Sequence, residues 1–228
     1  MAATVTVTDP ICSDAGAART HRVELISMAY DSGWRSMGAH RQTLTVTRNP
    51  GFDDPAKYEL TSRLSLKPGR YELRFAADSG GLTGSVYVSL EVPNFAKEPL
   101  SLSGMLLEKA TTRRAPVGAS LTDLLPIVPT TTRTFTRVDQ PVAFLRVYEG
   151  GSKPAMPVAM TASIKNSQDE IVSSRASTIE PGAFANARSA DYRFTVPIGT
   201  LLPGEYLLTI GATSDGRSLD RAVRFTVE

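Results

Sequence analysis

Hydrophobic and polar residues alternate along most of the chain with the two-residue period of β-strands. In the clearest run, Tyr71, Leu73, Phe75 and Ala77 face one side and the residues between them face the other. Similar runs are separated by turns rich in Gly, Pro, Asn and Asp, and no segment sustains a capped helical period. The pattern predicts an all-β protein, with strands near residues 4–8, 23–30, 44–46, 58–66, 71–77, 86–92, 142–148, 158–164, 171–174, 192–196, 206–212 and 222–227.

Two Pro-Gly turns each deliver a tyrosine to the start of an alternating strand. Pro sets φ for such a turn, and Gly accepts the positive φ that follows. A tyrosine at this point is typical of the tyrosine corner of immunoglobulin-like sandwiches, where its hydroxyl bonds back to the backbone. We therefore predict buried rings and hydroxyl-to-backbone bonds at both corners. The six structural corner residues are Pro68, Gly69, Tyr71, Pro203, Gly204 and Tyr206.

The two corners belong to a longer internal repeat with a constant offset of 135 residues, as from Pro68 to Pro203. The offset holds across strands and turns, which chance would not produce. It predicts two tandem immunoglobulin/fibronectin-III-like β-sandwiches related by internal duplication. The matched residues include Val23, Leu25, Tyr71, Leu73, Ala77, Val88, Leu90 and Val92, which become Val158, Met160, Tyr206, Leu208, Ala212, Val223, Phe225 and Val227.

The repeat divides the chain into domain 1 (residues 1–93), a short linker (94–98) and domain 2 (99–228). The two copies differ at their starts, because only residues 1–22 precede the first matched strand of domain 1, whereas 99–157 precede that of domain 2. Domain 1 thus has room for one early strand where domain 2 has room for about three. We therefore expect that an N-terminal piece of domain 1 is missing, is contributed from elsewhere or is dispensed with.

Domain 2 contains the longest segment without strand alternation, residues 109–132. Its apolar residues and its prolines are unlike the composition of a disordered linker. We expect it to pack on the second sandwich and cover a sheet edge, with its basic part exposed. Edge protection with no partner is the plainer alternative. The candidate partner contacts are Lys109, Arg113 and Arg114.

Composition excludes some function classes. With 25 basic and 23 acidic residues the net charge is +2, which argues against a nucleic-acid surface. The single cysteine, Cys12, cannot form an internal disulfide, and no apolar run approaches the roughly 20 residues of a membrane span. No signal peptide is visible, so the protein is cytoplasmic or this is a piece of a longer exported chain.

No catalytic, cofactor or metal motif stands out. The chain lacks G-x-S-x-G, P-loop, G-x-G-x-x-G and H-E-x-x-H patterns. His21 and His40 have no further ligands at zinc spacing. Cys12 and His21 could form a nucleophile and base, but no third group that would orient them is in view. Two pairs of acidic residues are candidate Ca²⁺ ligands, although acidic residues in turns usually hydrogen-bond to the backbone of the turn. We predict no enzyme activity, cofactor or metal; the acidic pairs are Asp53 with Asp54 and Asp215 with Asp220.

Several stretches resemble the C-terminal region of bacterial von Willebrand factor A-related proteins, mostly from acidobacteria. The similarity is carried by residues 84–104, 125–135 and 144–148. In that family an exported A-type domain with a D-x-S-x-S metal-ion-dependent adhesion site lies upstream. This chain has no such motif, so the family's metal and ligand binding do not carry over. The resemblance implies a tandem β-sandwich tail of a secreted or cell-envelope protein.

The leading functional hypothesis is a non-enzymatic structural spacer or protein-interaction module. Its partner would be another protein or an upstream domain of the same polypeptide, and not nucleic acid. The alternative is a carbohydrate- or ligand-binding module, which needs an exposed aromatic platform around Trp34, the only tryptophan. A hydrolase would need a pocket of converging polar groups that the sequence does not assemble.

Overall fold

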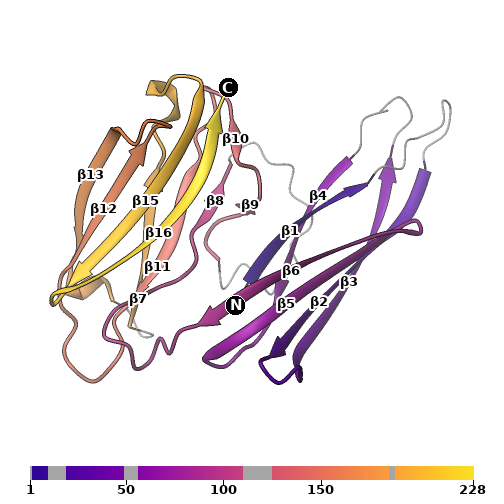
Figure 1. The fold of residues 1–228 in the computed structure, drawn as a ribbon, viewed down its shortest axis with the longest axis horizontal. Coiled ribbons are helices and arrows are strands. Elements are labelled where there is room, and N and C mark those ends of the chain that lie inside the picture. The colour runs from indigo at the N-terminus through magenta and orange to yellow at the C-terminus, as the bar shows by residue number, and fades with distance from the viewer. Residues whose placement is uncertain (1, 10–18, 49–55, 110–124, 185–187) are drawn as a thin grey trace. The chain divides into compact units, whose positions relative to one another are not determined.

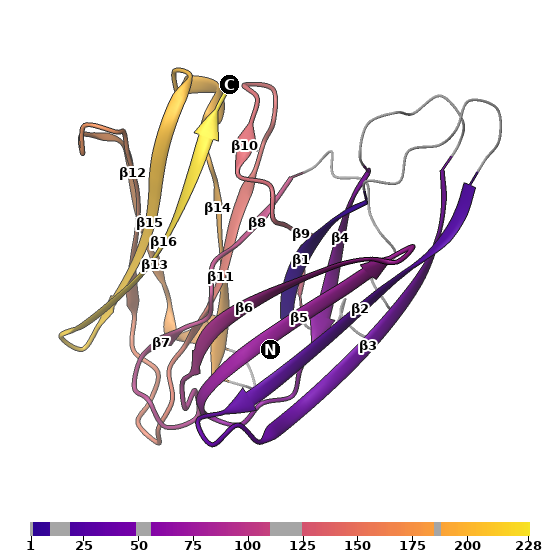
Figure 2. The same ribbon diagram turned by 45° about the vertical axis from the view of Figure 1, so that its right-hand side comes forward.

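A computed structural model describes residues 2–9, 19–48, 56–109, 125–184 and 188–228, with the predicted strands in place (Figure 1). The described residues form two units: domain 1 contains those up to Val92 together with Leu125 and Pro126, and domain 2 contains residues 93–109 and 127–228. Leu125 and Pro126, which we expected to pack on the second sandwich, thus group with domain 1. Domain 1 has a four-stranded antiparallel sheet in the order β3-β2-β5-β6, and a separate β1–β4 pair faces it (Figure 2). These strands are β1 (Ala2–Asp9), β2 (Arg19–Asp31), β3 (Ser36–Arg48), β4 (Ala56–Arg63), β5 (Gly69–Ser79) and β6 (Leu82–Val92).

Domain 2 is a fuller sandwich of two sheets, ordered β10-β16-β15-β12-β13 and β14-β11-β8-β9, with β7 also paired to β11. Among the described residues, the single 3₁₀ turns Pro181–Ala183 and Ile198–Thr200 lie between strands. The strands are β7 (Ser101–Leu102), β8 (Leu106–Glu108), β9 (Pro129–Thr130), β10 (Thr134–Phe135), β11 (Val142–Tyr148), β12 (Val158–Lys165), β13 (Ile171–Ile179), β14 (Ser189–Thr195), β15 (Gly204–Ser214) and β16 (Arg217–Val227).

Each domain is an immunoglobulin/fibronectin-III-like sandwich whose core lies between its two sheets. Alternation explains the core, because every second residue of β5, and likewise of β15, points inward. The core of domain 1 includes Val7, Val23, Leu25, Leu60, Leu73 and Phe75. That of domain 2 includes Leu102, Leu107, Phe135, Leu145, Met160, Ile164, Phe194, Leu208 and Ile210.

The structure confirms the internal duplication at the level of strand register. The order β3-β2-β5-β6 repeats as β13-β12-β15-β16, and each pair keeps the same partners after adding 135. Both copies carry an irregularity at the same position of β2 and β12. Examples are Val23–Leu44 with Val158–Ile179, Leu25–Ala77 with Met160–Ala212, and Gly69–Val92 with Gly204–Val227.

At both Pro-Gly turns, the tyrosine hydroxyl makes the predicted hydrogen bond to the backbone. The Tyr71 hydroxyl donates to the Lys67 carbonyl at 2.9 Å, and the Tyr206 hydroxyl to the Leu202 carbonyl at 2.7 Å. Both tyrosines are only 8% exposed. The glycines before them have φ of 153° and 156°, which other residues rarely adopt. The assignment of these turns to the immunoglobulin tyrosine corner stays a prediction.

Residues 94–98, which the sequence suggests are a linker, instead pack as part of domain 2. The Phe95 and Tyr148 ring centroids are 4.2 Å apart. The N–H of Gly150 donates to the Glu98 carbonyl, and that of Gly151 to the Ala96 carbonyl, both at 2.8 Å. The alternation rule misses this segment because it is held by turn hydrogen bonds and one aromatic contact rather than by a strand ladder.

The starts of the two domains differ, as the unequal lengths before the first matched strand suggest. Residues 110–124 of the long irregular segment lie outside the described residues, but from Ile127 onward the chain packs in domain 2. There β7 and β8 pair with β11, and β10 runs parallel to β16 with Phe135 buried in the core. Among residues 2–9, 19–48 and 56–92, no strand takes the places of these three.

The tyrosine hydroxyls predict a matched stability effect. Tyr71→Phe and Tyr206→Phe should each lower the free energy of unfolding by about 1–3 kcal/mol, because a backbone carbonyl loses its partner. Chemical denaturation measures the change. The control Tyr87→Phe, at a residue 59% exposed, should stay within about 0.5 kcal/mol of wild type. Denaturation midpoints equal to that of the wild type in both Tyr71→Phe and Tyr206→Phe would show that these hydroxyls do not stabilise the fold.

Close backbone approach at Gly150 predicts a second effect. A Cβ there would lie 2.5 Å from the Glu98 carbonyl oxygen and 2.6 Å from that of Phe95, so Gly150→Ala must displace residues 94–98. The Gly150 and Gly151 amides should then exchange faster with solvent, as hydrogen exchange can show. Gly104→Ala is the control, because a Cβ there meets nothing within 4 Å. Unchanged exchange in Gly150→Ala would contradict the packing described above.

Candidate functional site

Three aromatic rings surround the guanidinium of Arg74 on the outer face of the domain 1 sheet. The Arg74 Cζ lies 4.8 Å from the ring centroid of Tyr30, 5.1 Å from that of Trp34 and 5.4 Å from that of Tyr87. Strand register brings them together, since Arg74 on β5 is directly opposite Tyr87 on β6 and next to Met28 on β2. We call Tyr30, Trp34, Arg74 and Tyr87 the Arg74 cluster.

The charge at the centre of the cluster is permanent. The Arg74 Nε donates to Glu72 Oε1 at 2.7 Å, and this hydrogen bond raises the pKa of Arg74 against the opposing effect of desolvation. A guanidinium over an aromatic face is attracted by the ring quadrupole. The cluster is therefore a preorganised group of one cation and three rings, whose members restrict one another's rotamers.

A tight hairpin displays Trp34 to solvent. Trp34 is 64% exposed. Its φ is 60°, a left-handed backbone conformation that bulky residues other than glycine rarely adopt. Asp31 holds the turn by accepting from the N–H groups of Gly33 and Arg35 and from Arg35 Nε. The backbone bond from Arg35 is the main cause of the lowered Asp31 pKa.

The same hairpin in domain 2 shows that the turn does not require tryptophan. There Asn166 accepts from the N–H groups of Gln168 and Glu170, and Asp169 takes the left-handed position with φ of 62°. Aspartate tolerates this conformation better than an aromatic residue does. The other members of the Arg74 cluster are also replaced in domain 2, where Tyr30, Arg74 and Tyr87 correspond to Lys165, Thr209 and Ala222. The cluster is therefore specific to domain 1.

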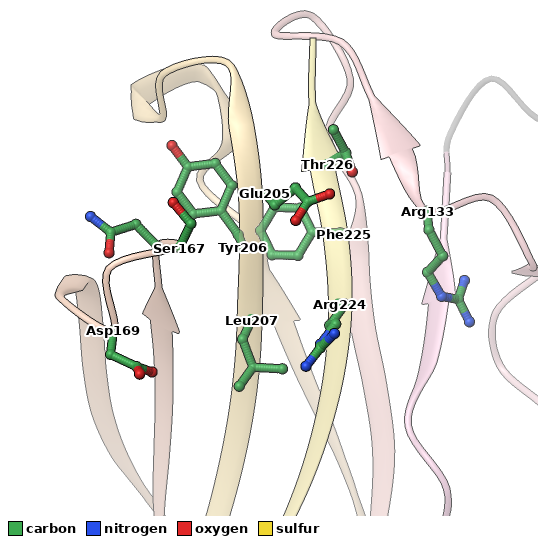
Figure 3. A pocket seen from close by; sticks show the side chains of 10 residues that line it. Arg133, Ser167, Asp169, Glu205, Tyr206, Leu207, Arg224, Phe225 and Thr226 are labelled. Atoms are coloured by element: carbon green, nitrogen blue, oxygen red, sulfur yellow. The ribbon is translucent and has the colours of Figure 1, made fainter.

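The equivalent face of domain 2 carries a shallow hollow of about 510 Å³ instead (Figure 3). Glu205 and Arg224 border it from β15 and β16, and Asp169 from the β12–β13 hairpin. Its aromatic members, Tyr206 and Phe225, are core residues that are 8% and 3% exposed. A ligand there would meet a rim of mixed charge and little aromatic surface, so the Arg74 cluster is the stronger candidate for recognition.

The sequence identified Trp34 but missed its three companions. Tyr30, Arg74 and Tyr87 are far apart in the chain, and only the pairing of β2, β5 and β6 unites them. The alternation pattern placed Arg74 on the outer face of its strand. To place Tyr87 beside Arg74, one would also have needed the register of β5 against β6.

Lys109, expected to be an exposed partner contact, is a structural residue of domain 2. Its Nζ lies 3.0 Å from Asp139 Oδ2 and 6.0 Å from the Phe135 ring centroid, and its side chain is 23% exposed. Burial raises the pKa of Asp139, but bonds from Thr136 and Lys109 outweigh that effect and lower it overall. A buried carboxylate needs such a cation, which is why Lys109 turns inward.

Other predicted positions lie apart or cannot be placed. Arg113, Arg114, Cys12, Asp53 and Asp54 lie outside the described residues. His21 and His40 are on neighbouring strands, but their partners, Val46 and Ser27, place them six register positions apart. In the described part of the chain, no three His, Cys, Asp or Glu side chains gather to hold a metal ion, and no helix is long and apolar enough to span a membrane.

Known proteins offer only distant similarity. No protein-family model and no curated protein matches the chain. The β-glucuronidase of Parabacteroides merdae aligns over 99% of this chain and 28% of its own length, at 10% identity and a TM-score of 0.32. The chicken interferon gamma receptor alpha chain aligns over 98% and 97% respectively, at 12% identity and a TM-score of 0.27.

A third alignment, to the FN1–FN3 domains of chicken CNTN1, covers 97% of this chain and 67% of that one, at 9% identity and a TM-score of 0.23. The chain thus spans less than a third of the glucuronidase it resembles. Alignments at these TM-scores carry no argument about function. The description of each domain as a sandwich comes from its own sheet order and register.

The cation–π contacts predict a fluorescence change, because Trp34 is the only tryptophan. Arg74→Gln removes the guanidinium from the indole face, so quenching of Trp34 emission by acrylamide should increase. Arg70→Gln is the matched control, since Arg70 lies on the same outer face of β5 but pairs with Glu91. Equal quenching in Arg74→Gln and wild type would mean that the guanidinium does not shield the ring.

Asp139 predicts a pH dependence of stability. Its pKa is below the ordinary 3.8, so its ion pair stabilises the folded state above that pH and is lost as pH falls through the lower, folded-state pKa. Asp139→Asn should destabilise the protein by about 1.5–3 kcal/mol at pH 7 and by much less at pH 2–3. Denaturation at several pH values tests this. Asp169→Asn, whose side chain is 89% exposed, is the control.

Proposed function

We propose that the chain is a non-enzymatic protein-interaction module and that the Arg74 cluster is its contact surface. The observation that carries the proposal is the gathering of one arginine and three aromatic rings on a solvent-facing sheet, with Trp34 64% exposed. Trp, Tyr and Arg are the residues most enriched among those that dominate protein–protein binding energy. Because they already restrict one another, little side-chain entropy remains to be lost on binding.

The divergence of the two copies supports this role. A purely structural sandwich needs no aromatic group at this hairpin, because domain 2 keeps the same turn and register with Asp169, Thr209 and Ala222. Trp34 also occupies a conformation that favours other residue types, and backbone outliers of this kind cluster at functional sites. A binding role accounts for a tryptophan that the backbone itself disfavours.

A carbohydrate-binding surface is the alternative function, and Trp34 is the observation that favours it. Sugar rings stack on open aromatic faces, whereas here a guanidinium already lies against a face of each ring. The groups that remain accessible are ring edges, tyrosine hydroxyls and the arginine itself. These suit the mixed apolar and polar surface of a protein better than the flat face of a sugar.

The wider setting of the module rests on sequence resemblance alone. We infer that it belongs to an exported von Willebrand factor A-related protein, in which an upstream A-type domain of the same polypeptide is one candidate partner. Reading the native coding sequence upstream of Met1 tests this. An A-type domain with a D-x-S-x-S motif and a signal peptide would support the inference, and an intergenic region there would overturn it.

The contact surface can be tested with a defined probe, a random peptide library displayed on phage and selected on the immobilised full chain. Binding peptides should converge on the Arg74 cluster, because preorganised aromatic and arginine surfaces dominate recognition. Their affinity should fall at least about tenfold, or 1.4 kcal/mol, in Trp34→Asn and in Tyr87→Ala. Asparagine is chosen because it tolerates the left-handed turn.

The matched control is Val138→Ala, which shortens a side chain of domain 2 at a residue that is 89% exposed. Peptides whose binding survives both cluster variants would place the contact surface elsewhere. Titration with neutral hexasaccharides, followed by Trp34 fluorescence, tests the alternative. A saturable signal that Tyr87→Ala abolishes would favour carbohydrate binding over the protein-interaction role.

A further inference from the structure

Among the described residues, β6 is a sheet edge of domain 1, and its composition is unusual for that position. It is the last strand in the order β3-β2-β5-β6, and it runs for 11 residues with one charged side chain, Glu91. Long edge strands are usually protected by charges or proline, because their free N–H and C=O groups invite further pairing. Its counterpart β16, at the same register, carries four charged residues, Arg217, Asp220, Arg221 and Arg224.

The inward-facing side chains of β6 are also uncovered. Val86 and Val88 lie opposite Phe75 and Leu73, so they point to the core side of the sheet, yet they are 44% and 46% exposed. Leu82, at the end of the same row, is 53% exposed. An apolar row that faces inward but remains open to water is what a sandwich leaves when one of its covering strands is absent.

Domain 2 shows what covers this row. There β10 runs parallel to β16, with the Thr226 N–H donating to the Arg133 carbonyl at 2.7 Å and the Glu228 N–H to the Phe135 carbonyl at 2.9 Å. Phe135 enters between the sheets and is 1% exposed. Further along, Arg221 takes the place of Val86 and donates to the carbonyls of Leu102 and Ser103 beside β7.

We propose that the β6 edge of domain 1 binds an extended segment of a partner protein as an added parallel strand. The repeat supplies one of the two bonds, because Glu91 corresponds to Thr226 and so directs its N–H to the open edge, whereas Pro93, in the place of Glu228, has no N–H. By alternation the N–H groups of Ser89 and Tyr87 point the same way. The surface is separate from the Arg74 cluster except for Tyr87, and it does not depend on the function proposed for that cluster.

The partner segment has a definite chemistry. Main-chain hydrogen bonds supply affinity, and alternate side chains supply specificity, as in other cases of strand addition. One aromatic residue should occupy the place that Phe135 fills in domain 2. The residues two and four positions before it should be aliphatic, because in the parallel register of domain 2 they would face Leu90 and Val88, and Val88 is 46% exposed. Between them small polar residues face outward.

A second copy of this chain fits the edge less well. Two copies related by a two-fold axis would pair their β6 strands antiparallel, since symmetric edge-to-edge contacts are isologous. The covering strand in domain 2 is parallel. The parallel arrangement is the one that aligns an inserted aromatic residue with the uncovered row, so a partner segment is the occupant we infer.

The test uses the full chain and synthetic peptides of residues 130–137, Thr-Thr-Thr-Arg-Thr-Phe-Thr-Arg, carrying Thr131→Val and Arg133→Val. Amide hydrogen exchange at Ser89 and Glu91 should slow about fourfold with free peptide at three times its Kd. The unmodified peptide should bind about tenfold more weakly, because it lacks the two aliphatic contacts. A peptide that also carries Phe135→Ser should give no protection.

Two protein variants complete the test. Ser89→Pro removes an N–H that points to the open edge and should abolish peptide binding, whereas Arg224→Pro at the same register of β16 should not. The peptide variants keep the test valid should Ser89→Pro unfold. No protection by the divaline peptide would overturn the proposal. Protection that appears without peptide and disappears on dilution would show a second copy as the occupant, which also overturns it.

Discussion

Register between β5 and its two neighbours is the constraint on which both faces of domain 1 depend. A strand that slips by one residue turns all its side chains to the opposite face, so the pairing that buries Leu73 and Phe75 also sends Arg74 outward. Once Arg74 is outward, its partners follow from the same ladders, with Tyr87 opposite on β6 and Tyr30 close by on β2. The hydroxyl of Tyr71 and the carboxylate of Asp31 fix the two ends of this arrangement through bonds to the backbone. The packing of the core and the assembly of the Arg74 cluster are thus set by one pairing.

Duplication provides an internal control that a single domain would lack. The two copies share the order, register and bulge position of four strands and the geometry of the turns between them, so the shared ladder does not account for differences within these elements. At the β2–β3 hairpin the turn is conserved while its displayed residue changes from Trp34 to Asp169. Along β6 and its counterpart β16, the ladder to β5 or β15 is the same in both copies, while the number of charged residues rises from one to four. Each difference lies where a side chain or strand edge meets solvent, which is where function can diverge without loss of the core.

Much of the architecture could be predicted because it depends on local, repeated signals. Alternation located the strands, Pro-Gly-x-Tyr located the corners, and the constant offset revealed two copies. The sequence was less informative wherever a contact depends on pairing between distant strands. Arg74 meets Tyr87 only through the β5–β6 ladder, and Lys109 turns inward only because Asp139 is buried nearby. Residues 94–98 resemble a linker in composition, but Gly150 has no side chain to keep them away, so they pack in domain 2. Contacts that depend on strand pairing or on close backbone packing cannot be predicted from the pattern of hydrophobic and polar residues alone.

The unequal starts of the two domains also connect stability with binding. Domain 2 buries Leu102, Leu107 and Phe135 from strands that have no counterpart among the described residues of domain 1. Apolar burial of this kind contributes about 25 cal/mol for each Å² removed from water, so domain 1 folds without a contribution that its twin has. A strand that covers Val86 and Val88 would add that burial and complete the ladder at β6. Because a ligand that binds only the folded state stabilises it by mass action, occupancy of this edge and stability of domain 1 are thermodynamically linked. If a partner binds at β6 as proposed, the domain that presents the aromatic cluster is also the one whose folding would respond to that partner.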